Sequence, residues 1–364
     1  MKVLEKLNKN VNKINPYQPG RPIEDVAREL GLDPDGIVKL ASNESALGVA
    51  PSAIQVIQNF AQEAYRYPDG GAFALRQKIC KKFEIEDKEV IFGSGSNEIL
   101  VFLAMTLMGE GKSVVASEKA FVIYKILSMM TGTEFREIPM NGLTHDLNAM
   151  ADAITEDTSI VFVCNPNNPT GSMVTEDEID KFMDRVPEDV LVVFDEAYAE
   201  ICLGEMPNTM KYFRQGRASI VLRTFSKAYG LAGLRVGYGM GPESIIQALE
   251  KPRQPFNTTL IGQLAAAAAL DDEEFIEESR ETYLQGRQLF EDFCEKKGLT
   301  YEKAYANFML IKTGNGAEVT KNLTAEGVIV RPMSPYGMDK WIRVSFGKPG
   351  ENQRFVEALD KILN

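Results

Sequence analysis

The sequence predicts an α/β protein with a mostly parallel sheet sandwiched between helices, followed by a smaller α+β unit. Three observations lead to this fold class. Short apolar runs recur between residues 90 and 238, and segments with helical periodicity separate most of them. Several of the runs are apolar throughout, as expected for strands covered on both faces. The chain has 364 residues, 44% hydrophobic and 25% charged, which suits roughly two globular domains.

The expected elements begin with an N-terminal arm. Residues 1–43 are predicted to form this arm together with a short helix and strand of the smaller unit, because prolines at positions 16, 19 and 22 interrupt the first stretch. Residues 44–252 are predicted to form the large domain. Its strand candidates are Val90–Phe92, Ser113–Ala116, Ile160–Cys164, Val190–Phe194, Ile220–Arg223 and Arg235–Tyr238.

The texture of the sequence changes after residue 252, and residues 253–364 are predicted to form a small C-terminal domain. A helix is expected over Glu274–Lys297, where aromatic and aliphatic residues recur near helical spacing and Gly298 ends the pattern. The remaining elements are expected to be strands at Tyr305–Lys312, Val328–Arg331 and Trp341–Ser345 and a closing helix at Phe355–Leu363.

The charge balance excludes several classes of partner. Lys and Arg number 40 against 52 Asp and Glu, a net charge of −12, whereas nucleic acids and anionic membranes need a basic footprint. An anionic ligand must therefore be held locally by a few arginines. The four cysteines form no CxxC pair, no apolar run approaches the ~18 residues of a membrane span, and the first residues lack a secretory pattern. We expect buried free thiols and a cytoplasmic protein.

Some familiar motifs are incomplete here. The segment 93–98 begins like a dinucleotide-binding fingerprint, but Glu98 occupies the position of the third glycine. Gly111-Lys112-Ser113 resembles the end of a P-loop, but Thr106 stands where the first glycine is needed. His145 is the only histidine in the sequence, which argues against Ser-His-Asp catalysis and a multi-histidine metal site. We expect His145 in a polar surface loop and expect no metal site.

The stronger candidates lie after predicted strands, where open α/β sheets bind their ligands. The strand at 90–92 runs into Gly93-Ser94-Gly95-Ser96-Asn97 and then a helix, an arrangement that presents backbone N–H groups to an anion. Asn168, Asp195 and Lys227 follow three further strands. Each feature alone has a plain structural alternative, namely a capped turn, ordinary turn chemistry, a helix N-cap, or a lysine that reaches solvent.

Taken together, these residues indicate one chemistry. A lysine amine can condense with an aldehyde cofactor. A cofactor of the pyridoxal phosphate type also needs a carboxylate at its ring nitrogen, hydrogen bonds to its ring hydroxyl, an aromatic face and a phosphate-binding loop. Asn168, Asp195 and Lys227 are spaced by about 30 residues, which suits successive strand ends joined by crossovers.

Two sets of motifs point to a known family. The first set is Asn168-Pro-Thr-Gly171, Asp195-Glu-Ala-Tyr198, Ser226-Lys227 and Leu231-Ala-Gly-Leu-Arg235-Val-Gly-Tyr238. The second set is Asn15-Pro-Tyr17-Gln-Pro-Gly20, Leu40-Ala-Ser-Asn43-Glu44, Tyr65-Arg-Tyr67-Pro68, Gly327-Val-Ile-Val-Arg331-Pro and Ile342-Arg343-Val. By these motifs nearly the whole chain resembles the fold-type I pyridoxal-phosphate aminotransferases, and within them most of all the histidinol-phosphate aminotransferases. The resemblance implies an aspartate aminotransferase-like fold built on a seven-stranded sheet.

The resemblance also implies roles for individual residues. Lys227 would bind the cofactor aldehyde and move the substrate proton, and Asp195 would pair with the ring nitrogen. The other residues implied at the cofactor are Asn168 and Tyr198 at the ring hydroxyl, Phe121 on the ring face, Gly95, Ser96, Asn97, Thr224, Ser226 and Arg235 at the phosphate, and Tyr67 at the phosphate of the neighbouring subunit's cofactor. The residues implied at the substrate are Tyr17, Asn43, Arg331 and Arg343.

The activity implied by the resemblance is transamination between L-histidinol phosphate and 2-oxoglutarate, giving imidazole acetol phosphate and L-glutamate, in histidine biosynthesis. The implied assembly is a homodimer with shared active sites. Two other reactions on the same cofactor remain open, namely aromatic amino-acid transamination and decarboxylation of a phosphorylated amino acid. A non-catalytic binding protein on this scaffold is disfavoured because Lys227, Asp195 and Asn168 are all present.

Overall fold

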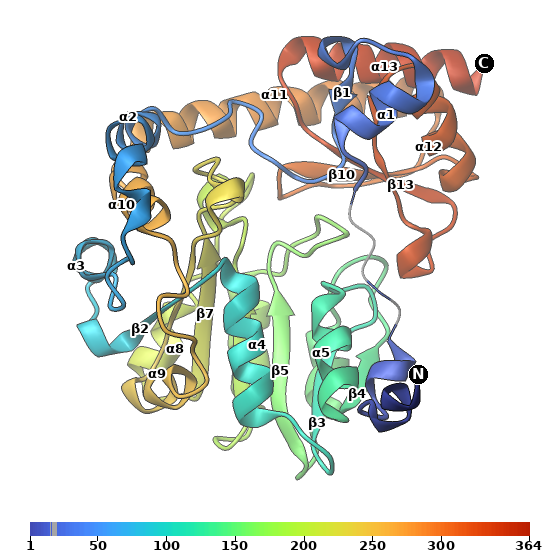
Figure 1. The fold of residues 1–364 in the computed structure, drawn as a ribbon. Coiled ribbons are helices and arrows are strands. Elements are labelled where there is room, and N and C mark those ends of the chain that lie inside the picture. The colour runs from blue at the N-terminus through green and yellow to red at the C-terminus, as the bar shows by residue number, and fades with distance from the viewer. Residues whose placement is uncertain (15, 17–19) are drawn as a thin grey trace.

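A seven-stranded sheet forms the larger part of the protein (Figure 1). The computed structural model describes residues 1–14, 16 and 20–364. The strand order is β2-β8-β7-β6-β5-β3-β4, and only β8 runs antiparallel to its neighbours among the pairs of this sheet. The strands are β2 (Val90–Gly93), β3 (Ser113–Ser117), β4 (Glu134–Ile138), β5 (Thr158–Cys164), β6 (Leu191–Asp195), β7 (Ser219–Thr224) and β8 (Gly237–Met240). The predicted fold class is confirmed.

Both faces of this sheet are buried, because successive strand residues supply two separate cores. On β5, Val161 and Val163 join one core while Phe162 joins the other. The core containing Phe162 is closed by α4 (Ser96–Leu107), α5 (Ile123–Thr131) and α9 (Glu243–Glu250). The core containing Val161 is closed by α2 (Pro51–Phe60), α3 (Phe73–Phe83), α6 (Leu147–Asp152), α7 (Glu176–Met183), α8 (Met210–Arg214) and α10 (Leu260–Ala269).

The smaller unit lies above the carboxyl ends of the large sheet in Figure 1. Its antiparallel sheet has the order β12-β13-β10-β9, and β1 pairs with β11 in a separate parallel ladder. The strands are β1 (Val38–Lys39), β9 (Tyr301–Glu302), β10 (Phe308–Lys312), β11 (Val328–Ile329), β12 (Arg331–Pro332) and β13 (Trp341–Ser345). The helices are α1 (Ile23–Leu30), α11 (Glu273–Lys297), α12 (Gly316–Ala325) and α13 (Pro349–Leu363). Because β1 pairs with β11, the N-terminal segment contributes to this unit.

Short 3-10 helices connect these elements. They are η1 (Lys2–Lys6), η2 (Val11–Lys13), η3 (Pro34–Gly36), η4 (Ala61–Tyr65), η5 (Asp87–Glu89), η6 (Ala199–Ile201), η7 (Ala232–Leu234) and η8 (Ser334–Tyr336). The N-terminal residues lie against α5, where the buried Asn10 approaches Gly132. Lys9 forms an ion pair with Glu110, which lies between α4 and β3. In the described part of the chain, no helix has the length and apolar character needed to cross a bilayer.

Four predictions about local structure were wrong or incomplete. The edge strand β4 was missed because its sequence, Glu-Phe-Arg-Glu-Ile, carries three charges and is only partly buried. The single strand expected at Val328–Arg331 is divided between two sheets. Arg235 does not start a strand, since its φ of 56° is left-handed and β8 begins at Gly237. His145 is buried rather than at the surface.

The surroundings of His145 explain its burial. The distance from Nδ1 to the Ser117 hydroxyl is 2.6 Å, and the distance from Nε2 to the Cys164 carbonyl oxygen is 2.8 Å. A carbonyl only accepts, so Nε2 carries the proton and Nδ1 accepts from Ser117. Burial lowers the pKa of His145, which keeps the ring neutral. The histidine thus joins β3 to β5 as a structural side chain. The four cysteines are buried and free, as predicted.

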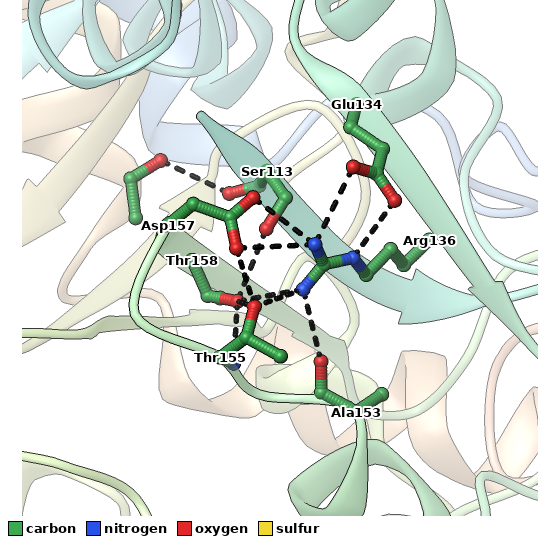
Figure 2. A network of polar contacts seen from close by, with 8 residues as sticks. Ser113, Glu134, Arg136, Ala153, Thr155, Asp157 and Thr158 are labelled. Carbon is green, nitrogen blue, oxygen red and sulfur yellow. Dashed lines mark hydrogen bonds and ion pairs between the residues drawn. The ribbon is translucent and has the colours of Figure 1, made fainter. Parts of the chain in front are cut away.

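A polar network ties the amino ends of β3, β4 and β5 together, at the sheet edge opposite the loops discussed below (Figure 2). Arg136 on β4 donates to both carboxylate oxygens of Asp157, at 3.1 and 3.0 Å, and to Glu134 at 2.9 Å. It also donates to Thr155 and to the carbonyl of Ala153. Hydrogen bonds from Thr155 and Arg136 lower the pKa of Asp157 to about 2. These contacts hold the charged edge strand in place.

We expect Arg136→Ala to destabilise the fold by about 1–2 kcal/mol, since several charge-assisted hydrogen bonds are lost together. Arg185→Ala, which removes an exposed arginine bonded to Asp152, is expected to cost less than about 0.5 kcal/mol. Urea unfolding of both variants measures the difference. Equal stability of the two variants would contradict a structural role for the Arg136 network.

Candidate active site

The loops at the carboxyl ends of β2, β5, β6 and β7 enclose a cavity of about 190 Å³. Its lining residues are Gly95, Ser96, Asn97, Phe121, Cys164, Asn168, Asp195, Ala197, Tyr198, Thr224, Ser226, Lys227 and Arg235. The fold therefore brings together eleven of the twelve residues expected around a cofactor. Cys164 and Ala197 were not predicted. Cys164 is the last residue of β5, and Ala197 directly precedes the predicted Tyr198. Their apolar character gave no chemical signal.

One end of the cavity has the composition of an anion site. Helix α4 begins at Ser96 after Gly95, whose φ of 75° favours glycine. A Cβ at Gly95 would lie 2.7 Å from Nη2 of Arg235, so the guanidinium group packs directly against the turn. Arg235 also donates to the carbonyl of Ser94 at 3.3 Å and lies 3.5 Å from the Ser226 hydroxyl. A helix N-terminus, an arginine and hydroxyl groups together suit a phosphate group.

Close packing holds this turn in place from the neighbouring strand. A Cβ at Gly237, the first residue of β8, would lie 2.2 Å from the backbone nitrogen of Ser96. Residue 237 therefore has to be glycine for the turn to approach β8. The glycines at 95 and 237 fit a group that needs the backbone itself as a ligand.

Asp195, the last residue of β6, lies deep in the cavity with 3% of its surface exposed. Its Oδ2 accepts a hydrogen bond of 2.7 Å from the hydroxyl of Tyr124, whereas Oδ1 has no hydrogen-bond partner in the described part of the chain. Burial raises the pKa of the carboxyl group to about 6, against the opposing effect of the Tyr124 hydrogen bond. A buried acid with a free oxygen fits the protonated nitrogen of an aromatic ring.

Lys227 follows β7 and reaches the same cavity. Its Nζ donates to the carbonyl of Ser42 at 3.3 Å and lies 5.9 Å from the centroid of the Tyr198 ring. Burial, together with the positive charge of Arg343, lowers the pKa of the amine to about 8. A lysine with a lowered pKa has a larger share of neutral amine, which is the nucleophilic form.

Two polar side chains, Tyr198 and Asn168, line the same cavity as Asp195. The Tyr198 hydroxyl accepts a hydrogen bond of 3.0 Å from Nδ2 of Asn43, and the side-chain Oδ1 of Asn168 accepts one of 2.6 Å from Nη1 of Arg343. Asn43 is buried, and its backbone N–H donates to Ser345 on β13. These bonds connect the large sheet to the smaller unit.

A second cavity of about 220 Å³ adjoins the first and shares Phe121, Asn168, Tyr198 and Lys227 with it. Its other lining residues are Gly20, Ala41, Ser42, Asn43, Arg331, Tyr336 and Arg343. Arg331 and Arg343 are directly opposite each other on the paired strands β12 and β13, which puts both side chains on one face. The buried Arg343 also donates to the carbonyl of Ala41 at 3.1 Å. Two guanidinium groups beside the Lys227 amine suit an acidic substrate.

Among the described residues, Tyr67 is the predicted site residue that lines neither cavity. Tyr67 is 82% exposed and stacks on Phe256 with ring centroids 4.9 Å apart. Its predicted contact with a neighbouring subunit's cofactor stays a prediction. Tyr17 lies outside the described residues. Sequence reasoning in turn missed Ser42 and Tyr336, although Ser42 directly precedes the predicted Asn43.

Comparison with known proteins agrees with this geometry. Residues 35–359 match the family described as "Aminotransferase class I and II". The chain is 46% identical over 357 residues to a histidinol-phosphate aminotransferase of Akkermansia muciniphila, covering 98% of each protein. It is 43% identical over 361 residues to histidinol-phosphate aminotransferase 2 of Carboxydothermus hydrogenoformans, covering 98% of this chain and 99% of that protein.

A solved structure shares the fold over almost the whole chain. The crystal structure of histidinol-phosphate aminotransferase from Sinorhizobium meliloti in complex with pyridoxal-5′-phosphate matches with a TM-score of 0.88 at 25% identity. The match covers 98% of this chain and 97% of that chain. The resemblance inferred from the motifs is confirmed, and the chain belongs to the class I and II aminotransferase family.

Proposed function

We propose that this protein is a pyridoxal-phosphate-dependent aminotransferase that transfers the amino group between L-histidinol phosphate and 2-oxoglutarate, giving imidazole acetol phosphate and L-glutamate. The observation that carries the proposal is one cavity that contains a buried acid with a free oxygen, a lysine with a lowered pKa and an anion site. The names of the full-length relatives support the choice of substrate.

The side chains fit the cofactor group by group. Oδ1 of Asp195 would hold a proton on the ring nitrogen, and Asn168 and Tyr198 would hydrogen-bond the ring hydroxyl. Phe121 would cover one ring face. The residues proposed around the phosphate are Gly95, Ser96, Asn97, Thr224, Ser226 and Arg235. When bound, pyridoxal phosphate supplies an aldehyde that captures amines and a ring that withdraws electrons from the substrate Cα.

Lys227 is the residue proposed to act on protons. Burial and the charge of Arg343 favour its neutral form. The amine would hold the cofactor through its aldehyde, and as a free base it would accept the proton from the substrate Cα and would return a proton to the carbon at the other end of the transfer. Its position in both cavities, with Ser42 as a hydrogen-bond acceptor, supports a role between cofactor and substrate.

The substrate would occupy the second cavity. Arg343 and Arg331 would take the carboxylate of glutamate in one half-reaction and the phosphate of histidinol phosphate in the other. Asn43 connects this cavity to Tyr198, so that substrate binding and the cofactor hydroxyl share one hydrogen-bond network. Tyr17, Asn43 and Tyr67 keep their predicted roles in this proposal.

We expect Arg343→Ala to lower kcat/KM for glutamate by about 10- to 100-fold, because a charge-assisted contact to the carboxylate is lost. Arg343→Lys is expected to recover only part of the loss, since an ammonium group cannot bind both carboxylate oxygens in one plane. Arg354→Ala, which alters a half-buried arginine of α13 that donates to the backbone carbonyl of Glu326 and lines neither cavity, is the control. Glutamate kinetics equal to wild type in Arg343→Ala would contradict the assignment.

Purified protein tests the whole proposal. The expected results are a visible absorbance band that borohydride removes, its bleaching by glutamate, and turnover of histidinol phosphate with 2-oxoglutarate. A kcat/KM for phenylalanine above that for histidinol phosphate would support aromatic transamination instead. Release of carbon dioxide without formation of glutamate would support the decarboxylase alternative. Absence of the band would refute any pyridoxal phosphate enzyme.

We also propose a cytoplasmic homodimer composed of an N-terminal arm (1–43), a large domain (44–252) and a small domain (253–364). The exposed aromatic side chains of Tyr65, Tyr67, Phe73 and Phe256 support a subunit contact near Tyr67, because apolar surface of this kind is commonly covered. The buried free cysteines support a reducing compartment.

A further inference from the structure

We propose that Tyr124 is a positioning residue for the cofactor ring. Its hydroxyl holds Asp195 by one carboxylate oxygen and leaves the other for the ring nitrogen, while its own ring supports Phe121 from the side. The inference rests on the proposed function and adds to it a residue that lines neither cavity.

The contacts of Tyr124 connect three elements of the site. The residue lies on α5 and is fully buried. Its ring stacks on Phe162 of β5 with centroids 4.3 Å apart and an angle of 3° between the planes. The rings of Phe121 and Tyr124 form an edge-to-face pair, with centroids 5.8 Å apart and 86° between their planes. The hydroxyl donates to Oδ2 of Asp195 at 2.7 Å. A single rigid ring thus fixes both the carboxylate and the aromatic face that the cofactor ring would contact.

The hydrogen bond decides which way the carboxylate turns. Asp195 ends β6, and its side chain can rotate about the Cβ–Cγ bond unless one oxygen is fixed. Tyr124 fixes Oδ2, and Oδ1 is then the oxygen without a partner in the described residues. Burial raises the pKa of Tyr124 well above its ordinary value, so the hydroxyl keeps its proton and is the donor in its hydrogen bond to the Asp195 carboxylate.

The bond also sets how strongly Asp195 holds a proton. Donation from Tyr124, and to a smaller extent from the backbone N–H of Ala197, favours the ionised carboxylate and opposes the effect of burial on its pKa. The other ionisable groups near Asp195 are Cys164 on β5, Glu196 and Tyr198. Cys164 and Tyr198 are kept neutral by burial, and Glu196 is paired with Arg223 at 2.8 Å. The Tyr124 hydroxyl is therefore the side-chain group that keeps the Asp195 carboxylate weakly basic, so that the shared proton resides on the ring nitrogen.

The test compares Tyr124→Phe with Tyr212→Phe in the full-length enzyme. Tyr212 is a matched control because it is also buried, stacks on Phe194 at 5.7 Å, and donates to a carboxylate, Oδ1 of Asp180, at 2.6 Å. We expect Tyr124→Phe to weaken the affinity for pyridoxal phosphate about tenfold, the effect of one lost charge-assisted hydrogen bond. Tyr212→Phe is expected to leave this affinity unchanged. Titration of each apoprotein with pyridoxal phosphate measures it.

The pH dependence of the bound cofactor's visible absorbance is the second readout. Without the Tyr124 hydroxyl, the Asp195 carboxylate becomes more basic and draws the proton away from the ring nitrogen. The ring would then carry less positive charge. The Lys227 nitrogen, bound to the aldehyde carbon of the cofactor, would therefore keep its proton to higher pH. We expect the midpoint of the titration to rise in Tyr124→Phe and not in Tyr212→Phe. We also expect kcat to fall while KM for glutamate stays the same.

The outcomes separate this inference from the proposed function. A Tyr124→Phe protein that melts at a lower temperature but matches wild type in affinity, titration midpoint and kcat would overturn the positioning role. A double mutant with Asp195→Asn provides a second check, since the two effects on cofactor affinity are expected to be non-additive. Additive effects would also overturn the inference. If the wild-type protein forms no complex with pyridoxal phosphate, the proposed function itself fails.

Discussion

Lys227→Ala is expected to lower transamination at least about 10³-fold, because in the proposed function one amine would perform both the covalent attachment and the proton transfer. No other lysine lines the first cavity among the described residues, so no second amine is in reach. The visible absorbance of the bound cofactor is expected to lose its sensitivity to borohydride. Stopped-flow absorbance with glutamate measures the half-reaction directly.

Lys112→Ala is the control for Lys227→Ala. Like Lys227, Lys112 donates to a backbone carbonyl, that of Leu107 at 3.0 Å, but it precedes β3 at the opposite edge of the sheet. We expect this variant to keep wild-type rates. Activity within a few-fold of wild type in Lys227→Ala would show that the amine at residue 227 does not react, and the proposed function would have to be withdrawn.

Asp195→Asn is expected to lower kcat/KM by about 10²- to 10³-fold, the range for the loss of one preorganised electrostatic group. The asparagine keeps the size of the side chain and can still accept from the Tyr124 hydroxyl. It lacks the negative charge that would hold a proton on the ring nitrogen. The chemical step is therefore expected to slow more than substrate binding weakens, and single-turnover kinetics separate the two.

The same substitution is expected to stabilise the apoprotein above neutral pH. The carboxyl pKa is about 6 in the folded chain and 3.8 as the ordinary value, so the folded state holds this proton more tightly than the unfolded state. The contribution of this carboxyl group to folding stability is fully present below pH 3.8, and it is lost as the pH rises through about 6. Asparagine has no proton to lose. The melting temperature of Asp195→Asn apoprotein is expected to exceed that of wild type at about pH 8 and to match it at about pH 4.

Melting curves of the two apoproteins across this pH range provide the check. A lower melting temperature for Asp195→Asn than for wild type at the higher pH would show that the carboxylate is stabilised by groups other than Tyr124. The expected opposite changes in stability and activity would show that the acid is retained for its chemistry, because a buried charge without a cation costs folding free energy.

The fold could be predicted from the sequence wherever a segment is strongly apolar. The strands at 160–164, 190–194 and 220–223 were found because both of their faces are covered, which leaves continuous runs of β-branched residues. The same argument explains why β4 was missed. It lies at the edge of the sheet, where Arg136 and Glu134 remain in contact with solvent and bind each other.

Residues whose environment comes from distant segments were harder to assign. His145 carries no local signal of burial, since its partners Ser117 and Cys164 belong to two different strands. The break between Val328–Ile329 and Arg331–Pro332 depends on two distant strands, because β1 pairs with the first half of this segment and β13 pairs with the second half. Neither partner is visible in the local pattern of hydrophobicity.

The sequence by itself determined which side chains to select as candidates, because Asn168, Asp195 and Lys227 each come directly after or close to the end of a predicted strand and together suit one chemistry. The tertiary structure alone decided how those groups are oriented and how acidic they are. Tyr124 meets Asp195 across 71 residues, Asn43 meets Tyr198 across 155, and Arg343 meets Asn168 across 175. Orientation and pKa depend on burial and on hydrogen bonds of a few ångströms, and such distances between remote segments exist only after the chain has packed.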